Sequence, residues 1–221
     1  MTPDIRTSPV LCNLCGSANF KTLFSARDRL HGLEGGFQYV RCSDCGLVYM
    51  NPQVIPDCIS NIYPEDYSQH QAYSSRSDKG SRRPHVPKII LNSLASDSRA
   101  LDVGCGNGEF LHLLQQHCHC QVNGLEISEN AVLLAKKRYG IDIFRGDILS
   151  APYEEKSFDV ITLRSVIEHI SDPKEALKKA FTLCKPSGLL FIKTPNCDSF
   201  GAKLFKSRWC PVECPRHLFL F

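Results

Sequence analysis

Short apolar segments alternate with helical segments along the second half of the chain, and this alternation constrains the fold more than any other feature. Apolar segments of strand length stand at 100–103, 121–127, 141–147, 158–163 and 188–194. Apolar residues recur at helical spacing over 85–96, 108–117, 128–140 and 172–184. Apolar strands that alternate with helices predict a mostly parallel sheet covered on both faces. We therefore expect a doubly wound α/β fold.

Helix-end signals support these assignments. Ser128 precedes an apolar run, as an N-cap does, and Gly140 follows a run of basic residues, as a C′ glycine does. Asp172 stands before Pro173, which is favoured at the first position of a helix.

The chain divides into three predicted parts. Residues 1–64 contain paired cysteines among short apolar stretches, and residues 65–84 form a predicted linker rich in Ser, charge and Gly. Residues 85–221 form the predicted α/β domain. No apolar run approaches the 18 or so residues of a membrane span, and the first ten residues carry no apolar signal segment. We therefore expect a soluble, cytoplasmic protein with reduced thiols.

A glycine-rich loop stands between the first of these strands and the helix that follows. In the segment LDVGCGNG, Asp102 is followed by Gly104, Gly106 and Gly108. Glycine lets the backbone approach a ligand closely, and the next helix start offers free N–H donors, which favours a nucleoside-bearing cofactor. A dinucleotide fingerprint would need Gly or Ala where this chain has Glu109, which disfavours NAD.

Two carboxylates follow at the ends of the next two strands. Glu126 stands near the end of the strand at 121–127, where a carboxylate can accept both hydroxyls of a ribose, and Asp147 closes the strand at 141–147. We expect both acids to face one crevice at the carboxyl edge of the sheet, with Asp147 accepting from an adenine amine.

Together these features resemble the class I S-adenosylmethionine-dependent methyltransferases from residue 85 to residue 196. The segment FDVITLRSVIEH contributes to the resemblance. It implies a Rossmann-like fold in which the glycine loop passes the methionine part of the cofactor, and Asp102 orders this loop and the methionine ammonium. By the same resemblance, Glu126 holds the ribose, and Asp147 meets the adenine amine, with an isoleucine on either side of the adenine ring. The cofactor residues implied are Asp102, Gly104, Gly106, Gly108, Glu126, Ile127, Asp147 and Ile148.

Two C-x-x-C-G units occupy the first part of the chain. They begin at Cys12 and at Cys42, with 26 residues between the pairs. Two residues between thiolates let one tight turn present both sulfurs to a tetrahedral ion, and a closed four-sulfur shell predicts structural zinc, with iron as the alternative. The predicted ligands are Cys12, Cys15, Cys42 and Cys45. Ahead of a methyltransferase-like domain, this zinc-ribbon-like module resembles a group of bacterial-type enzymes associated with methylation of sugars, polysaccharides or secondary metabolites.

Two histidines are the candidates for catalysis. Methyl transfer to an alcohol needs a base, and histidine titrates near neutral pH. By resemblance, His169 in SVIEHI follows the fourth strand near the place of the transferable methyl group, and His217 in PRHLFLF lines the acceptor pocket. A packing role is the alternative for each. The histidines and cysteines of HLLQQHCHC are interpreted as helix residues that point in several directions.

The sequence favours methyl transfer from S-adenosylmethionine to a small-molecule acceptor, such as a sugar or polysaccharide precursor. The chain ends within the apolar segment HLFLF, whereas the resembled family continues to two further strands, so we expect an incomplete domain. The alternatives are a truncated, non-catalytic cofactor- or zinc-binding protein and an RNA methyltransferase. The net charge of +3 makes nucleic acid an unfavoured partner, despite a basic cluster at Lys79, Arg82, Arg83 and Lys88.

Overall fold

The computed structural model describes residues 4–63 and 85–221, which form two compact units. The predicted linker at 65–84 lies outside the described residues, together with most of the basic cluster around it. The parallel unit comprises described residues 85–164 and 175–193. The antiparallel unit comprises described residues 4–63, 165–174 and 194–221.

A sheet of five parallel strands forms the parallel unit. Its strand order among the described residues is β10-β9-β6-β7-β8. The strands run Arg99–Val103 (β6), Gln121–Glu126 (β7), Phe144–Arg145 (β8), Phe158–Arg164 (β9) and Cys184–Lys193 (β10). The order reverses beside β6, so this sheet has the topological switch point at which doubly wound folds bind ligands.

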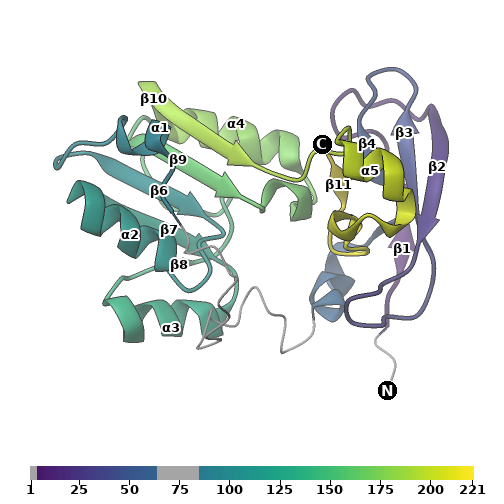
Figure 1. Cartoon of the computed structure of the whole chain (residues 1–221), viewed down its shortest axis with the longest axis horizontal. Coiled ribbons are helices and arrows are strands. Elements are labelled where there is room, and N and C mark those ends of the chain that lie inside the picture. Colours follow the sequence, from purple (N-terminus) through teal and green to yellow (C-terminus); the bar gives the residue numbers. More distant parts are fainter. Residues whose placement is uncertain (1–3, 64–84) are drawn as a thin grey trace. The chain divides into compact units, whose positions relative to one another are not determined.

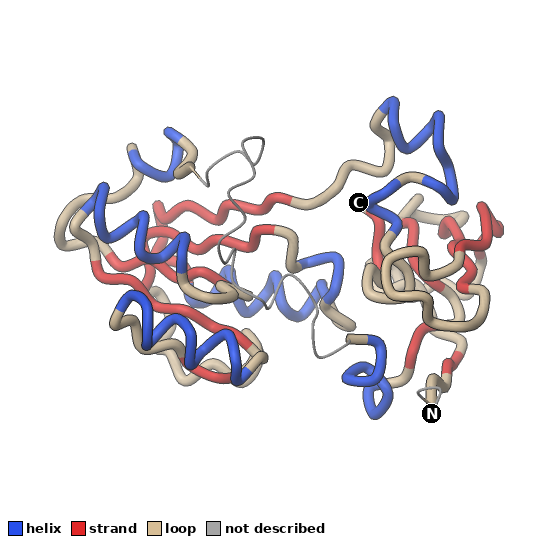
Figure 2. Tube along the Cα trace, turned by 60° about the horizontal axis from the view of Figure 1, so that its bottom comes forward, coloured by secondary structure: helices blue, strands red, loops and turns tan. Residues whose placement is uncertain are grey.

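Helices lie on both faces of this sheet, as the apolar periodicity predicts. They are Lys88–Leu91 (α1), Glu109–Cys118 (α2), Glu129–Tyr139 (α3) and Pro173–Leu183 (α4). Figure 1 shows α2 and α3 on one side of the sheet and α4 on the other, and Figure 2 shows the strands running side by side between them. The doubly wound α/β fold is therefore confirmed.

The predicted ends of α3 are also found. The Ser128 hydroxyl accepts a hydrogen bond from the Ala131 backbone N–H at 3.3 Å, and Gly140 adopts a left-handed conformation at the other end. Pro173 is the first residue of α4. By contrast, β10 begins at Cys184, before the predicted strand at 188–194, and its pairing with β9 shifts register between Cys184 and Leu189.

The antiparallel unit contains a second sheet, in the order β11-β4-β3-β2. Its strands are Phe20–Ala26 (β2), Phe37–Cys42 (β3), Val48–Met50 (β4) and Phe219–Leu220 (β11), and a separate pair joins Thr7–Ser8 (β1) to Gln53–Val54 (β5). Helical segments in this unit are Pro56–Ile62 (η1), Ile167–His169 (η2), Phe200–Phe205 (α5), Lys206–Arg208 (η3) and Cys210–Val212 (η4). The apolar segment at the end of the chain thus forms β11 and pairs with β4.

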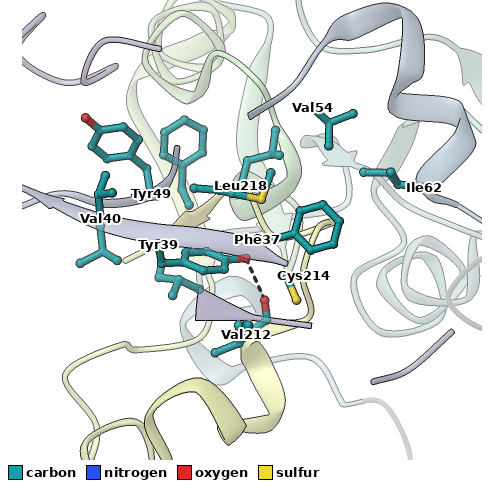
Figure 3. Close-up of a cluster of buried hydrophobic side chains, with 14 of the residues drawn as sticks. Phe37, Tyr39, Val40, Tyr49, Val54, Ile62, Val212, Cys214 and Leu218 are labelled. Atoms are coloured by element: carbon teal, nitrogen blue, oxygen red, sulfur yellow. Dashed lines mark hydrogen bonds between the residues drawn. The ribbon is translucent and has the colours of Figure 1, made fainter. Parts of the chain in front are cut away.

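Side chains from both ends of the sequence share the core of this unit (Figure 3). The Tyr39 hydroxyl on β3 lies 3.1 Å from the Val212 carbonyl oxygen and 2.6 Å from that of His217. Because one phenol contacts two carbonyls of the later segment, β3 and residues 212–217 are fixed together.

A buried ion pair makes a second connection of this kind. The Arg216 guanidinium, which is 0% exposed, donates to both carboxylate oxygens of Asp28, at 2.7 and 3.1 Å. It also donates to the carbonyl oxygens of Ile62 and Cys214. A bidentate pair of this geometry offsets much of the desolvation of its two charges, whereas either partner alone would be a buried, unpaired charge.

The predicted domain boundary at residue 85 differs from the boundaries of the two compact units. The sequence-based proposal assigns 85–221 to one domain, but residues 165–174 and 194–221 cluster with the first 63 residues. The reason is the long-range pairing of β11 with β4, for which no local pattern gives a signal. Among the described residues, no helix combines the length and the apolar character needed to cross a bilayer.

Candidate functional site

The glycine loop joins β6 to α2 in the parallel unit. Gly104, Gly106 and Gly108 have φ values of 63°, 55° and 76°, in the left-handed region that favours glycine. At Gly108 an added Cβ would also lie 3.0 Å from the Cβ of Ala135 on α3. All three glycines are therefore required by the backbone, and the last one also permits close packing of the loop against α3.

Glu126 connects this loop to the start of α3. One carboxylate oxygen accepts from the Gly106 N–H at 2.9 Å, and the other accepts from the Ser128 N–H at 2.9 Å. The side chain is buried, and each of its oxygens accepts one of these N–H groups. Because a carboxylate oxygen can accept more than one hydrogen bond, a carboxylate in this position can both order the loop and contact a ligand diol.

Asp102 is held by the neighbouring strand β9. Asp102 and Thr162 are paired in register, and the Thr162 hydroxyl donates to one Asp102 oxygen at 2.5 Å. Arg164 donates to the other oxygen at 3.2 Å and lies over the Phe110 ring, 3.5 Å from its centroid. Asp102 is thus a buried carboxylate whose position is set by β9.

Asp147 follows β8 and caps the turn after it. Its carboxylate accepts from the Ser150 N–H and from the Ser150 hydroxyl, both at 2.8 Å. The carboxylate is exposed and can take further donors. Of the two predicted isoleucines, Ile127 is 59% exposed and Ile148 is 1% exposed. Ile127 is therefore the one that offers surface to a ligand in this structure.

The predicted cofactor residues thus lie along the carboxyl ends of β6, β7 and β8, three neighbouring strands of the parallel sheet. The sequence analysis missed Thr162 and Arg164, the two partners of Asp102. Their signal was available, because both lie in the β9 segment FDVITLR, and a polar residue within an apolar strand indicates a buried hydrogen bond.

The four predicted zinc ligands come together in the antiparallel unit. The sulfur atoms of Cys12, Cys15, Cys42 and Cys45 all lie within 4.8 Å of one another, and we call them the cysteine cluster. The Sγ–Sγ distances are 3.4 Å between Cys12 and Cys45 and 3.5 Å between Cys15 and Cys42. A tetrahedral zinc ion with Zn–S bonds of about 2.3 Å separates its sulfurs by about 3.8 Å, so the residues present fit that ion.

The two turns that carry these cysteines have the same geometry. The N–H of Gly16 donates to the Cys12 carbonyl at 2.7 Å, and that of Gly46 donates to the Cys42 carbonyl at 3.1 Å, with both glycines at positive φ. Hydrogen bonds from the backbone N–H groups of Cys45 and Asp44 lower the pKa of the Cys42 thiol to about 7. In the same turn a backbone hydrogen bond from Leu47 lowers the pKa of Cys45, but burial and the neighbouring thiols outweigh it and raise that pKa to about 12.

The two predicted catalytic histidines also lie in the antiparallel unit. The ring centroids of His169 and His217 are 4.5 Å apart in an edge-to-face arrangement. The His169 Nδ1 lies 3.1 Å from the Arg216 carbonyl oxygen and 3.2 Å from the Tyr63 hydroxyl. The His217 Nδ1 lies 2.7 Å from the Pro211 carbonyl oxygen, and burial lowers the pKa of this histidine. The structure therefore brings the two histidines together.

Glu168 completes this arrangement, and the sequence analysis did not select it. It is 1% exposed, and burial raises its pKa. Neither carboxylate oxygen makes a hydrogen bond of ordinary geometry to a described residue, although the Thr194 hydroxyl lies near enough to lower the pKa of Glu168 in part. We call Glu168, His169 and His217 the histidine cluster.

Comparisons with known proteins identify the family of the chain. Residues 79–221 match the family described as a methyltransferase domain, which is well over half of the chain. The chain belongs to the S-adenosylmethionine-dependent methyltransferases.

Two curated relatives carry related names. The chain is 29% identical to a demethylmenaquinone methyltransferase of Staphylococcus haemolyticus over 149 residues, which cover 65% of this chain and 57% of that protein. It is 35% identical to a ubiquinone biosynthesis O-methyltransferase of Coxiella burnetii over 110 residues, which cover 48% of this chain and 46% of that protein. The chain therefore spans about half the length of these two relatives.

A solved structure supports the fold. The YcgJ protein from Bacillus subtilis matches with a TM-score of 0.51 at 20% identity, over 60% of each chain. At this identity the match shows the Rossmann-like methyltransferase fold alone, and it agrees with the fold expected from the sequence.

Proposed function

We propose that this chain transfers a methyl group from the sulfonium of S-adenosylmethionine to a small-molecule acceptor. The observation that carries the proposal is the Glu126 carboxylate at the carboxyl end of β7, which accepts from Gly106 of the glycine loop and from Ser128 at the start of α3, in the place where folds of this kind hold ribose hydroxyls. Asp102 lies near the end of β6 and Asp147 follows β8, and these two strands flank β7. In this proposal Asp102 is near the methionine end of the cofactor and Asp147 is near the adenine end.

The acceptor in this proposal is a sugar or polysaccharide precursor, as the resemblance of the cysteine module implies. The two relatives are named for quinone substrates, and a quinone precursor is the competing acceptor. A hydroxyl acceptor in either class needs a proton acceptor, and His169 and His217 are our candidates for it because they lie together.

We also propose that the cysteine cluster holds a structural zinc ion. The support is the donor set of four sulfurs and their spacing, which matches a closed tetrahedral shell. Elemental analysis of the purified chain tests this directly, with one zinc per chain expected from the cysteine cluster. Iron in place of zinc, with visible absorption from thiolate ligands, would contradict it.

Isothermal titration of the chain with S-adenosylmethionine, and separately with NAD, tests the cofactor. We expect micromolar binding of S-adenosylmethionine and a loss of about 10–100-fold in Glu126→Ala, because hydrogen bonds to a charged group contribute about 1.5–3 kcal/mol. Glu154→Ala is the matched control, since Glu154 is an exposed carboxylate in the same unit. Binding of NAD, or equal affinities of the two variants for S-adenosylmethionine, would contradict the proposal.

Turnover is tested next with the same variants. Purified chain, labelled S-adenosylmethionine and separate sugar-nucleotide and demethylquinone acceptors would distinguish the two acceptor classes by which product carries the label. Cofactor binding without label transfer to either class would contradict the proposed acceptors and leave the cofactor assignment intact.

A further inference from the structure

The histidine cluster has the composition and spacing of a metal site. One ligand atom from each of Glu168, His169 and His217 lies within 4.8 Å of those from the other two. The Leu218 N–H donates to the Glu168 carbonyl at 2.8 Å, which fixes η2 beside the later segment that carries His217. The three side chains are therefore positioned by backbone contacts within one compact unit.

The histidine rings are oriented by their Nδ1 atoms. In each ring Nδ1 faces a backbone carbonyl oxygen, that of Arg216 for His169 and that of Pro211 for His217. A carbonyl oxygen can only accept, so a ring that donates from Nδ1 has its lone pair on Nε2. The His217 Nε2 also lies 3.6 Å from a Glu213 carboxylate oxygen, and the His169 Nδ1 also lies 3.2 Å from the Tyr63 hydroxyl, so Glu213 and Tyr63 border the same cluster. Metal-bound histidines characteristically donate the other ring N–H in this way, which fixes the tautomer and the ring orientation.

The Glu168 carboxylate supplies an independent observation. It is almost fully buried and without a hydrogen bond of ordinary geometry to a described residue. A buried carboxylate without donors is costly unless it is protonated or a cation compensates its charge. The Arg216 guanidinium is directed to Asp28 and Glu213. Among the described residues, no Lys or Arg therefore forms an ion pair with Glu168.

We propose that Glu168, His169 and His217 bind a divalent first-row transition-metal ion, separate from the ion of the cysteine cluster. Two imidazoles and one carboxylate form a three-ligand set that leaves coordination positions open, in contrast to the closed shell of four thiolates. Nitrogen and oxygen ligands suit Mn²⁺, Fe²⁺, Co²⁺ or Zn²⁺, whereas Ca²⁺ and Mg²⁺ prefer oxygen ligands alone.

This inference rests on the antiparallel unit and does not require the proposed function. It does change the role of the two histidines if methyl transfer is established. An Nε2 lone pair that binds a metal ion cannot also take up a proton, so the histidines would act as ligands. An open position on the ion can bind an acceptor oxygen and lower the pKa of its hydroxyl.

Titration of the zinc-loaded chain with Mn²⁺, followed by the loss of the free-ion electron paramagnetic resonance signal, tests the site. Mn²⁺ is the weakest binder of the divalent series and does not displace zinc from thiolates. We expect one Mn²⁺ bound per chain. Glu168→Gln and His217→Ala should each weaken binding at least tenfold, because loss of a contact at a metal site typically costs about 10–100-fold. A parallel titration with Co²⁺ should show one weakly absorbing site of nitrogen and oxygen ligands.

Glu168→Gln is the decisive variant because it keeps the shape of the side chain and removes a buried charge, so the fold is retained. Its thermal unfolding without added metal checks this. His112→Ala is the matched control, since His112 stacks on Tyr139 in the parallel unit. Equal affinities in all three variants, or no binding of either ion beyond the cysteine cluster, would overturn the proposal.

Discussion

The two units differ in how their candidate sites are assembled from the sequence. In the parallel unit, the candidate cofactor residues all lie between residues 102 and 148, in the order in which the strands follow one another. In the antiparallel unit, Cys12 contacts Cys45, 33 residues away, and Asp28 pairs with Arg216, 188 residues away. A site of the first kind depends on local elements, whereas a site of the second kind depends on the whole unit having folded. Removing one long-range contact should therefore destabilise the antiparallel unit as a whole, whereas changes in the parallel unit should have effects confined to neighbouring elements and to the ligand site.

The largest difference in stability between the two units should follow removal of the metal from the cysteine cluster. Structural zinc can supply on the order of 10 kcal/mol to the folding of a small module. We expect Cys42→Ser, or a strong chelator, to abolish hydrogen-exchange protection in β3 and β4 while β6 and β7 stay protected. Cys210→Ser is the control, because Cys210 is exposed and lies outside the cluster. Equal loss of protection in both units would show that they do not fold separately.

Removal of Arg216 should have the next largest effect. Arg216→Ala leaves Asp28 buried without its partner, and breaking such a pair costs about 3–5 kcal/mol. Trp209, the one tryptophan of the sequence, lies in the antiparallel unit, so its fluorescence during urea unfolding reports on that unit. Arg41→Ala, at an exposed position, should change the unfolding free energy by about 0.5 kcal/mol or less. A similar cost in both variants would contradict the importance of the pair.

The corresponding test in the parallel unit is Asp102→Asn. The amide can still contact Thr162, but Arg164 loses its charged partner, and we expect a cost of about 1.5–3 kcal/mol. The cost should appear as faster hydrogen exchange in β6 and β9 and as weaker S-adenosylmethionine binding, with the Trp209 transition unchanged. Asp97→Asn, at an exposed position, is the control. A shift of the Trp209 transition would break the proposed separation of the two units.

A local change in the parallel unit should have a small effect. Ser128→Ala removes the cap of α3, which costs about 1 kcal/mol, whereas Ser128→Gly should cost only a few tenths. Hydrogen exchange in the first turn of α3 measures both. We expect Ser128→Ala to cost more stability than Ser128→Gly, and the reverse order would rule out the hydroxyl as the cap.

The Asp28–Arg216 pair also predicts a pH dependence confined to the antiparallel unit. Burial pushes the pKa of Asp28 upward, but hydrogen bonds from Arg216, His31 and Leu30 outweigh it and hold the pKa below its ordinary value. Stability from this group is therefore fully present above about pH 3.9 and is lost as the pH falls through the lower folded pKa. Trp209 unfolding midpoints between pH 6 and pH 2.5 should fall less steeply in Asp28→Asn than in the unchanged chain.

The same contrast explains what the sequence could predict. The helix α3 was predicted with its limits because Ser128 and Gly140 act within a few residues of the helix ends. The cysteine pairs were recognisable because each pair lies in one turn. Local sequence patterns were therefore sufficient to predict the elements of the parallel unit and to select the proposed zinc ligands.

Long-range contacts account for the rest. Nothing in HLFLF indicates that it pairs with Val48–Met50, because strand pairing across the chain leaves no periodic signal. Glu168 was missed for a similar reason, since its importance depends on burial and on the distant His217. The predicted placement of the two histidines in the α/β domain likewise followed sequence order, whereas both cluster with the first 63 residues.

The pairing of β11 with β4 has a consequence for biosynthesis. A ribosome releases Val48–Met50 long before it adds Phe219–Leu220, while the five described strands of the parallel sheet have all been synthesised by Lys193. Domains generally fold as units while the chain emerges, so the parallel sheet can form first. During that interval the edge of β4 lacks the strand that covers it, whereas the four cysteines of the cysteine cluster have all been synthesised, so early metal binding can order their two turns before β11 is added.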